Sequence, residues 1–252
     1  MEVITVLSRK GGTGKSTSAA ALGAGLRRRG YRVLFVDLDS QANLTYTLGA
    51  DAGGGSCMDL FTKRATIGAV LQHTNQGDVL PAGPDLATAD TVLTATGKEY
   101  VLREVLEPLK DSYDYVIVDT AAQLGVLSIA ALTAADRAII TAGADLFSLQ
   151  GMDLIADAVA AVRRYTNDKL QIDGLLLTRY NGRAVLARNM KDALDTMARQ
   201  LGTRLYRTTI RQCTALQEAA TMQQDIFDYA PRSNGAKDYD AFINEFLNER
   251  EV

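Results

Sequence analysis

The sequence predicts an α/β fold, a doubly wound, mostly parallel β-sheet with helices on both faces. Two observations carry this prediction. A glycine-rich stretch, Arg9–Thr17, directly follows the apolar run Val3–Leu7. Further short apolar runs alternate with segments of helical composition along the chain, which is typical of parallel strands joined by crossover helices. No composition shift marks a linker, so we expect one domain over residues 1–252.

The glycine-rich stretch has the composition of a phosphate-binding loop. Gly11, Gly12 and Gly14 permit backbone angles that a Cβ would hinder. The loop N–H groups and the first helical turn then face an anion, helped by the helix dipole. Lys15 can reach terminal phosphates, and the Ser16 hydroxyl can ligate Mg²⁺. The stretch therefore predicts nucleotide binding.

The remaining elements follow in order. A helix over Ser16–Arg29 stops at Gly30, and Tyr31–Val36 forms the next strand. Further helices are expected over Met58–Leu71, Leu86–Lys110, Leu149–Tyr165, Arg183–Leu201 and Ala236–Asn248. Further strands are expected near Val79–Leu80 and over Tyr115–Asp119, Ala138–Ala142, Gly174–Thr178 and Leu205–Tyr206, and a turn over Pro231–Gly235.

Acidic residues stand where two predicted strands end. Asp37 and Asp39 follow the second strand, and Asp119 ends the run Tyr115–Asp119. Open α/β sheets bind their ligands at the carboxyl ends of the strands. A carboxylate at the end of a buried strand is costly unless a cation or hydrogen bonds compensate it. Asp119 is thus a candidate to hold Mg²⁺.

The composition indicates the cellular compartment and which chemistry the side chains can support. The chain is 47% hydrophobic and 23% charged, without an apolar run long enough to cross a membrane. Cys57 and Cys213 form no paired motif, and His73 lies in a polar stretch, so neither disulfide nor metal chemistry is indicated. The first strand begins almost at Met1. We expect a cytoplasmic protein without a signal peptide or an additional N-terminal domain.

The charge distribution is uneven. The net charge is −3, but residues 163–211 contain eleven Lys and Arg against four Asp and Glu. Such a block favours a polyanionic partner. A solvated helical face explains the charge alone equally well.

Five stretches together resemble one known family. They are Lys10–Thr17 (KGGTGKST), Asp37–Gln41 (DLDSQ), Tyr115–Asp119 (YVIVD), Leu175–Asn181 (LLLTRYN) and Ala230–Tyr239 (APRSNGAKDY). This set is similar to the deviant-Walker-A ATPases of the P-loop class, specifically the ParA/Soj partition family. The likeness runs from about residue 2 to residue 248.

The resemblance implies ATP and Mg²⁺ as cofactors and a role for each matching residue. Lys10 would reach the phosphates of a second subunit, so that two ATP molecules lie between two chains. Lys15 would stabilise charge on the β- and γ-phosphates, and Asp39 would orient the attacking water and support the metal. The implied nucleotide-binding set is Lys10, Gly11, Gly12, Thr13, Gly14, Lys15, Ser16, Thr17, Asn181 and Pro231. The implied metal set is Ser16, Asp39 and Asp119.

Three positions depart from the family pattern. Ser40 and the stretch Thr120–Ala122 stand where the family usually has proline, and Arg9 replaces glutamine or glycine. Proline restricts the backbone. We therefore expect more mobile switch segments and an altered hydrolysis rate.

The resemblance also implies partners. An ATP-bound homodimer would bind DNA without sequence preference, and a ParB-type protein would stimulate hydrolysis. The basic block suits the DNA role, and phosphate contacts would make binding salt-dependent. The candidate DNA-binding residues are Arg183, Arg188, Lys191, Arg204, Arg207 and Arg211.

The sequence leaves other functional interpretations open. A MinD-like ATPase cycling on a membrane would need a basic amphipathic C-terminal helix, whereas Phe242–Val252 carries three glutamates and one arginine. An iron–sulfur reductase of the superfamily would need paired cysteines, and a tyrosine kinase a C-terminal tyrosine cluster. An ATP-binding module without turnover is a further alternative. We expect no membrane partner.

Overall fold

The computed structural model describes residues 1–248, apart from the side chains of residues 147 and 150. Seven strands form one sheet in the order β3-β4-β2-β5-β1-β6-β7. Neighbouring strands pair in parallel, except that β3 runs antiparallel to β4. The strands are β1 (Glu2–Leu7), β2 (Val33–Leu38), β3 (Gln72–Thr74), β4 (Gly77–Leu80), β5 (Tyr115–Thr120), β6 (Arg137–Gly143) and β7 (Gln171–Thr178). The predicted fold class is confirmed.

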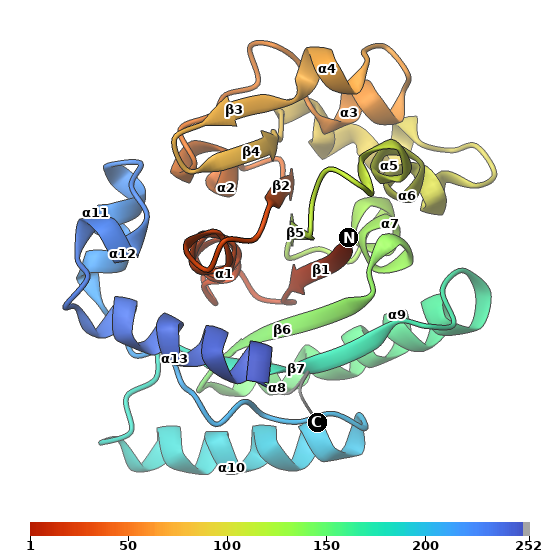
Figure 1. The fold of residues 1–252 in the computed structure, drawn as a ribbon. Coiled ribbons are helices and arrows are strands. Elements are labelled where there is room, and N and C mark those ends of the chain that lie inside the picture. Colours follow the sequence, from red (N-terminus) through yellow and green to blue (C-terminus); the bar gives the residue numbers. More distant parts are fainter. Residues whose placement is uncertain (249–252) are drawn as a thin grey trace.

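Helices cover both faces of the sheet (Figure 1). The α-helices are α1 (Lys15–Arg28), α2 (Asn43–Thr47), α3 (Cys57–Phe61), α4 (Ile67–Val70), α5 (Ala89–Val92), α6 (Val101–Leu106), α7 (Val126–Ala134), α8 (Leu146–Gln150), α9 (Met152–Tyr165), α10 (Val185–Gln200), α11 (Thr214–Thr221), α12 (Ile226–Tyr229) and α13 (Asn234–Asn248). In Figure 1, α10 and β3 lie at opposite ends of the molecule.

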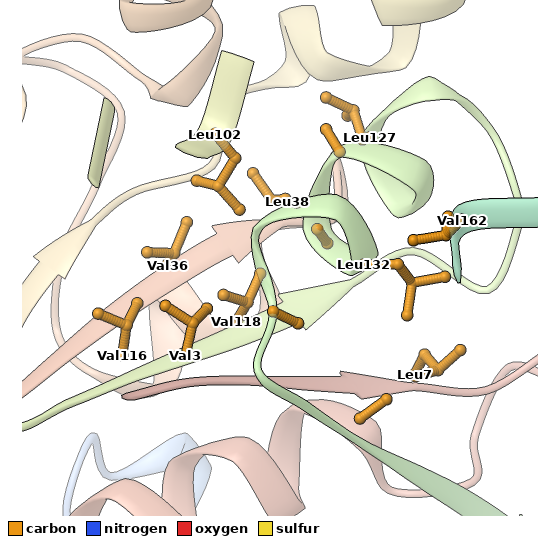
Figure 2. Packing of buried hydrophobic residues seen from close by; sticks show 14 of the residues in the cluster. Val3, Leu7, Val36, Leu38, Leu102, Val116, Val118, Leu127, Leu132 and Val162 are labelled. Carbon is orange, nitrogen blue, oxygen red and sulfur yellow. The ribbon is translucent and has the colours of Figure 1, made fainter. Parts of the chain in front are cut away.

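Two apolar clusters hold these layers together. On one face, Val3 and Val118 of the sheet meet α6, α7 and α9, with Leu102, Leu132 and Val162 as contacts (Figure 2). On the other face, alternate residues of the same strands pack against α1 and α13. Burying both faces of the central strands explains why their sequences are continuous apolar runs.

Two predicted helices are wrong in extent. The segment 58–71 contains α3 and α4 separated by a turn, in which Lys63 has φ 58°. The segment 86–110 divides into α5, α6 and three 3₁₀ turns, and Gly97 has φ 87° at the break. Left-handed backbone at both positions ends a right-handed helix, and neither break has a proline that would announce it.

The structure also differs from the prediction at several shorter segments. The predicted helix 149–165 is divided between α8 and α9. Leu205 forms only an isolated bridge to Leu175 in place of the predicted strand. The helix α13 begins at Asn234, inside the predicted turn. The helices α7, α11 and α12 have no counterpart in the prediction.

Candidate functional site

The candidate site lies where the carboxyl ends of the central strands meet. In the sheet register, Asp119 stands beside both Val6 and Asp37. The segments that follow β1, β2, β5 and β7 therefore converge. They line a cavity of about 800 Å³, a volume within the range of small-molecule sites.

The glycine-rich loop is held from behind by threonines. Thr13 Oγ1 donates to the Lys10 carbonyl at 3.2 Å, and Thr178 Oγ1 of β7 donates to the Thr13 carbonyl at 2.7 Å. Gly12 and Gly14 have φ of 76° and 74°, which side chains rarely adopt. These bonds use carbonyl oxygens of the loop, which leaves its N–H groups available to an anion.

The helix α1 begins at this loop without a cap. Gly14 is its N-cap and offers no side chain, and the first turn contains no acidic residue. Its first N–H groups therefore lack the carboxylate that often satisfies them. Lys15 lines the cavity with only 7% of its surface exposed, and Ser16 is half-buried beside it. The start of α1 has the features of a phosphate site.

Lys10 lies at the loop with its ammonium group engaged by the same chain. Its Nζ is 3.0 Å from Asp145 Oδ2, in the segment that follows β6. Both side chains are partly exposed. Partial burial acts to raise the pKa of Asp145, but the hydrogen bonds from Lys10 and Ser148 outweigh it and lower that pKa.

Asp37 and Asp119 are both buried, but in different surroundings. Asp37 accepts hydrogen bonds from the Asp39 N–H at 3.0 Å and from the Thr45 N–H and Oγ1 at 2.8 Å. Neither carboxylate oxygen of Asp119 has a hydrogen-bond partner among the described residues. Burial raises the pKa of Asp119, and the charge of Asp37 adds to this. Asp119 is therefore the carboxylate available to a metal ion.

The residues around Asp119 fit a magnesium ion. Residues 1–248 contain no cluster of three or more His, Cys, Asp or Glu side chains placed to hold a metal. Mg²⁺ binds through one or two carboxylates together with phosphate oxygens and water. Asp119 supplies one such carboxylate, and Ser16 lies close enough to lower its pKa. Such an ion would need the nucleotide to complete its ligands.

Asp39 lies in the loop after β2 and lines the same cavity. Its Oδ1 accepts the Gln41 N–H at 3.1 Å. The following Ala42 has φ 52° at the start of α2. This loop contains the departure at Ser40, which also lines the cavity.

Four predicted nucleotide residues, Lys10, Thr13, Asn181 and Pro231, do not line the cavity. Asn181 is exposed, and its Oδ1 accepts the Arg183 N–H at 3.2 Å. Pro231 is exposed just before α13. The opposite wall is formed by residues 210–217, with Tyr46 and Gln123 nearby. Sequence analysis missed this wall because no local motif marks it.

The predicted DNA residues fall into two groups. Arg183 and Arg188 are exposed around the start of α10, and the Lys191 ammonium lies 5.9 Å from the centre of the Tyr180 ring. Arg207 is exposed as well. The other two are held by carboxylates: Arg204 by Asp173 at 3.3 Å and Arg211 by Asp238 at 2.6 Å. Arg211 also lines the cavity.

Comparison with known proteins identifies the family. A family model described as an AAA domain (AAA_31) matches residues 1–172. The sporulation initiation inhibitor protein Soj of Bacillus subtilis is 35% identical over 243 residues, which cover 94% of this chain and 95% of Soj. The chain belongs to the ParA/Soj family of partition ATPases. This confirms the resemblance drawn from the sequence motifs.

Solved structures share the fold of this ParA/Soj-family chain. The Mycobacterium smegmatis protein named cobyrinic acid a,c-diamide synthase, solved with an ATP analog and magnesium, has a TM-score of 0.85, with 30% identity over 100% of this chain and 96% of that one. A putative plasmid partition protein of Borrelia burgdorferi bound to AMPPNP has a TM-score of 0.82, with 26% identity over 98% of this chain and 99% of that one.

Over residues 1–248, every helix is too short or too polar to cross a bilayer.

Proposed function

We propose that this chain is an ATP-dependent DNA partition ATPase. Mg-ATP drives its dimerisation, the dimer binds DNA without sequence preference, and hydrolysis resets it. One observation carries the proposal: Asp119, a buried carboxylate whose oxygens have no hydrogen-bond partner among the described residues, lies near Lys15 and Ser16 of the phosphate loop. The nucleotide-bound structures of the two similar proteins support ATP and Mg²⁺ as cofactors.

The roles of the site residues follow from their positions. The loop Gly11–Thr17 and the start of α1 bind the phosphates, and Lys15 neutralises charge that grows during transfer. Ser16 and Asp119 hold Mg²⁺, which when bound neutralises phosphate charge. Asp39, at the cavity wall, orients the attacking water and supports the metal. Asn181 and Pro231 do not line the cavity, and we assign them to the adenine from the family resemblance alone.

Lys10 is the residue of this site that we assign to the dimer. On dimerisation its ammonium leaves Asp145 and binds the phosphates of the nucleotide in the second subunit. The interface then requires ATP, because each triphosphate is neutralised by both chains. This requirement links nucleotide state to subunit association.

Cations around the start of α10 are proposed to bind DNA; Arg183 and Arg188 are exposed and Lys191 is half-buried. Arg183, Arg188 and Lys191 lie together near its first turns, and Arg207 extends the patch. We assign Arg204 and Arg211 a smaller part, because Asp173 and Asp238 already bind them. A ParB-type protein is the proposed activator of hydrolysis. DNA binding would make the protein nucleoid-associated in the cytoplasm.

The MinD-like alternative has weaker support. The apolar face of α13 is buried against the body of the protein, with Phe242, Ile243 and Phe246 at most 1% exposed. That face is therefore not available to a bilayer. Sedimentation with anionic vesicles in the presence of ATP would revive the alternative.

Fluorescence anisotropy on a random-sequence duplex tests the proposal. We expect binding with Mg-ATP, little with ADP, and a steep loss between 50 and 200 mM salt, as phosphate contacts require. Lys10→Ala should abolish ATP-dependent binding, and Lys110→Ala, at an exposed lysine paired with Glu107, should not. Absence of binding with every nucleotide would contradict the DNA role.

A second pair of variants tests the assignment of α10. Lys191→Ala should weaken binding to all sequences and reduce the slope of log affinity against log salt by about 1. Arg204→Ala should leave that slope unchanged, because its guanidinium binds Asp173. A reduced slope for Arg204→Ala with an unchanged slope for Lys191→Ala would indicate that DNA contacts a surface other than α10.

A further inference from the structure

Arg179 is a cation at the cavity that the roles above do not use. It directly follows β7 and has φ 51°, a left-handed conformation that is uncommon outside glycine. Its side chain is exposed and lines the cavity. Strained backbone held by its surroundings is a feature of functional sites.

The guanidinium of Arg179 is positioned on the phosphate loop. Its Nη1 donates to the Gly12 carbonyl at 3.1 Å. The preceding residue, Thr178, donates to the Thr13 carbonyl at 2.7 Å. Two consecutive residues at the end of β7 therefore bind two consecutive residues of the loop, and this fixes the Arg179 head group at the wall of the anion site.

The neighbouring cations have carboxylate partners. Lys10 is paired with Asp145, and Arg211 with Asp238. Over residues 1–248 no carboxylate lies within ion-pair distance of Arg179. A guanidinium has five N–H donors in a planar fork, and the Gly12 carbonyl uses one direction only. The remaining donors are free to bind an anion.

We propose that Arg179 is a further phosphate-binding residue of the nucleotide site, an inference that rests on the proposed ATPase function. Its guanidinium stays over Gly12 and donates to a phosphate oxygen of the bound nucleotide. An arginine suits this task because its fork matches the geometry of phosphate oxygens and keeps its charge at any physiological pH. Each nucleotide then meets two cations of its own chain, Lys15 and Arg179, and Lys10 of the second subunit.

A purely structural role makes a different prediction. If Arg179 only braced the loop through the Gly12 carbonyl, a neutral donor would serve as well. Arg179→Gln retains an N–H donor and removes the charge, and Arg179→Lys retains the charge and loses the fork. These two variants separate the phosphate role from the bracing role.

The test is the equilibrium affinity of the full chain for fluorescent ATP and for adenosine, with Mg²⁺. We expect Arg179→Gln to weaken ATP binding roughly tenfold or more, the range of a hydrogen bond to a charged group. Arg179→Lys should recover part of the loss, and adenosine affinity should stay unchanged. Arg64→Gln, which removes the same charge at an exposed site paired with Asp59, is the matched control.

The failure of this inference is distinguishable from failure of the proposed function. Failure of the wild-type protein to bind Mg-ATP would contradict the ATPase proposal itself. Wild-type binding combined with unchanged ATP affinity in Arg179→Gln would overturn only the role of Arg179. Equal losses for ATP and adenosine, or an Arg179→Gln melting temperature well below that of wild type without nucleotide, would assign the residue to the loop scaffold.

Discussion

At the scale of single residues, Asp37 and Asp119 show how the same side chain serves two purposes. The two residues face each other across the paired strands β2 and β5. Asp37 is satisfied by protein donors and shapes the loop that contains Asp39. Asp119 has no such donors, and a bound cation would compensate its buried charge.

Asp119→Asn should therefore uncouple nucleotide binding from Mg²⁺. Wild-type protein with Mg-ATP at 100 times its Kd should gain about 2.7 kcal/mol, which corresponds to a melting temperature roughly 5–10 °C higher. The variant should respond to Mg-ATP no more than to ATP with EDTA. Differential scanning calorimetry measures both. Asp114→Asn, at an exposed aspartate paired with Arg32, should behave like wild type. A full Mg²⁺ response in Asp119→Asn would refute the metal assignment.

At the scale of elements, α13 closes the fold over the helix that carries the phosphate loop. Its Tyr239 hydroxyl and the Ser18 hydroxyl of α1 are 2.9 Å apart in a buried hydrogen bond. Phe242 packs edge-on against both Tyr206 and Tyr239, with ring centres 4.8 and 6.5 Å away. The last described helix is thus part of the core that positions α1.

Phe242→Ala should destabilise the protein by about 3–5 kcal/mol, the usual cost of removing a buried phenyl ring. Urea unfolding followed by circular dichroism measures the change. Tyr165→Ala, at a tyrosine that is 69% exposed, is the control and should change stability by less than about 0.5 kcal/mol. A loss below about 1 kcal/mol in Phe242→Ala would mean that α13 is not integral to the fold.

Some of the elements could be predicted from the sequence and others could not. The strands β1 and β5 and the loop before α1 were predictable, because each is a local pattern of apolar runs, glycines and a terminal carboxylate. The breaks at Lys63 and Gly97 were missed: Lys63 gives no local signal for its left-handed backbone, and the glycine at position 97 was not read as a helix stop. The wall at residues 210–217 is brought to the cavity by the fold alone, and no periodicity within it indicates a ligand.

At the scale of the whole molecule, we propose that a second subunit completes the nucleotide site. The strands β1, β2, β5 and β7 deliver the loops to one edge, and Lys10 stands at that edge in a pair with Asp145. A lysine held within its own chain cannot bind a second subunit at the same time. The pair with Asp145 therefore competes with the contact that we propose between Lys10 and the second subunit.

Asp145→Asn should shift the monomer–dimer equilibrium toward the dimer in the presence of ATP. The neutral amide holds the Lys10 ammonium less tightly, and the proposed contact across the interface competes more easily. Analytical ultracentrifugation at several concentrations measures the Kd. Asp157→Asn, which removes a carboxylate from α9, is the control. A weaker dimer in Asp145→Asn would indicate that Asp145 itself belongs to the interface.

In the proposed dimerisation, the Lys10–Asp145 pair also affects the concentration at which the subunits associate. Each dimer requires two such pairs to open, so the cost of one pair enters the dimer Kd twice. A partly exposed ion pair is worth about 0.5 kcal/mol, and two of them raise the Kd about fivefold. An ion pair within each subunit thereby raises the protein concentration needed for association. Below that concentration the subunits stay monomeric even when ATP is abundant.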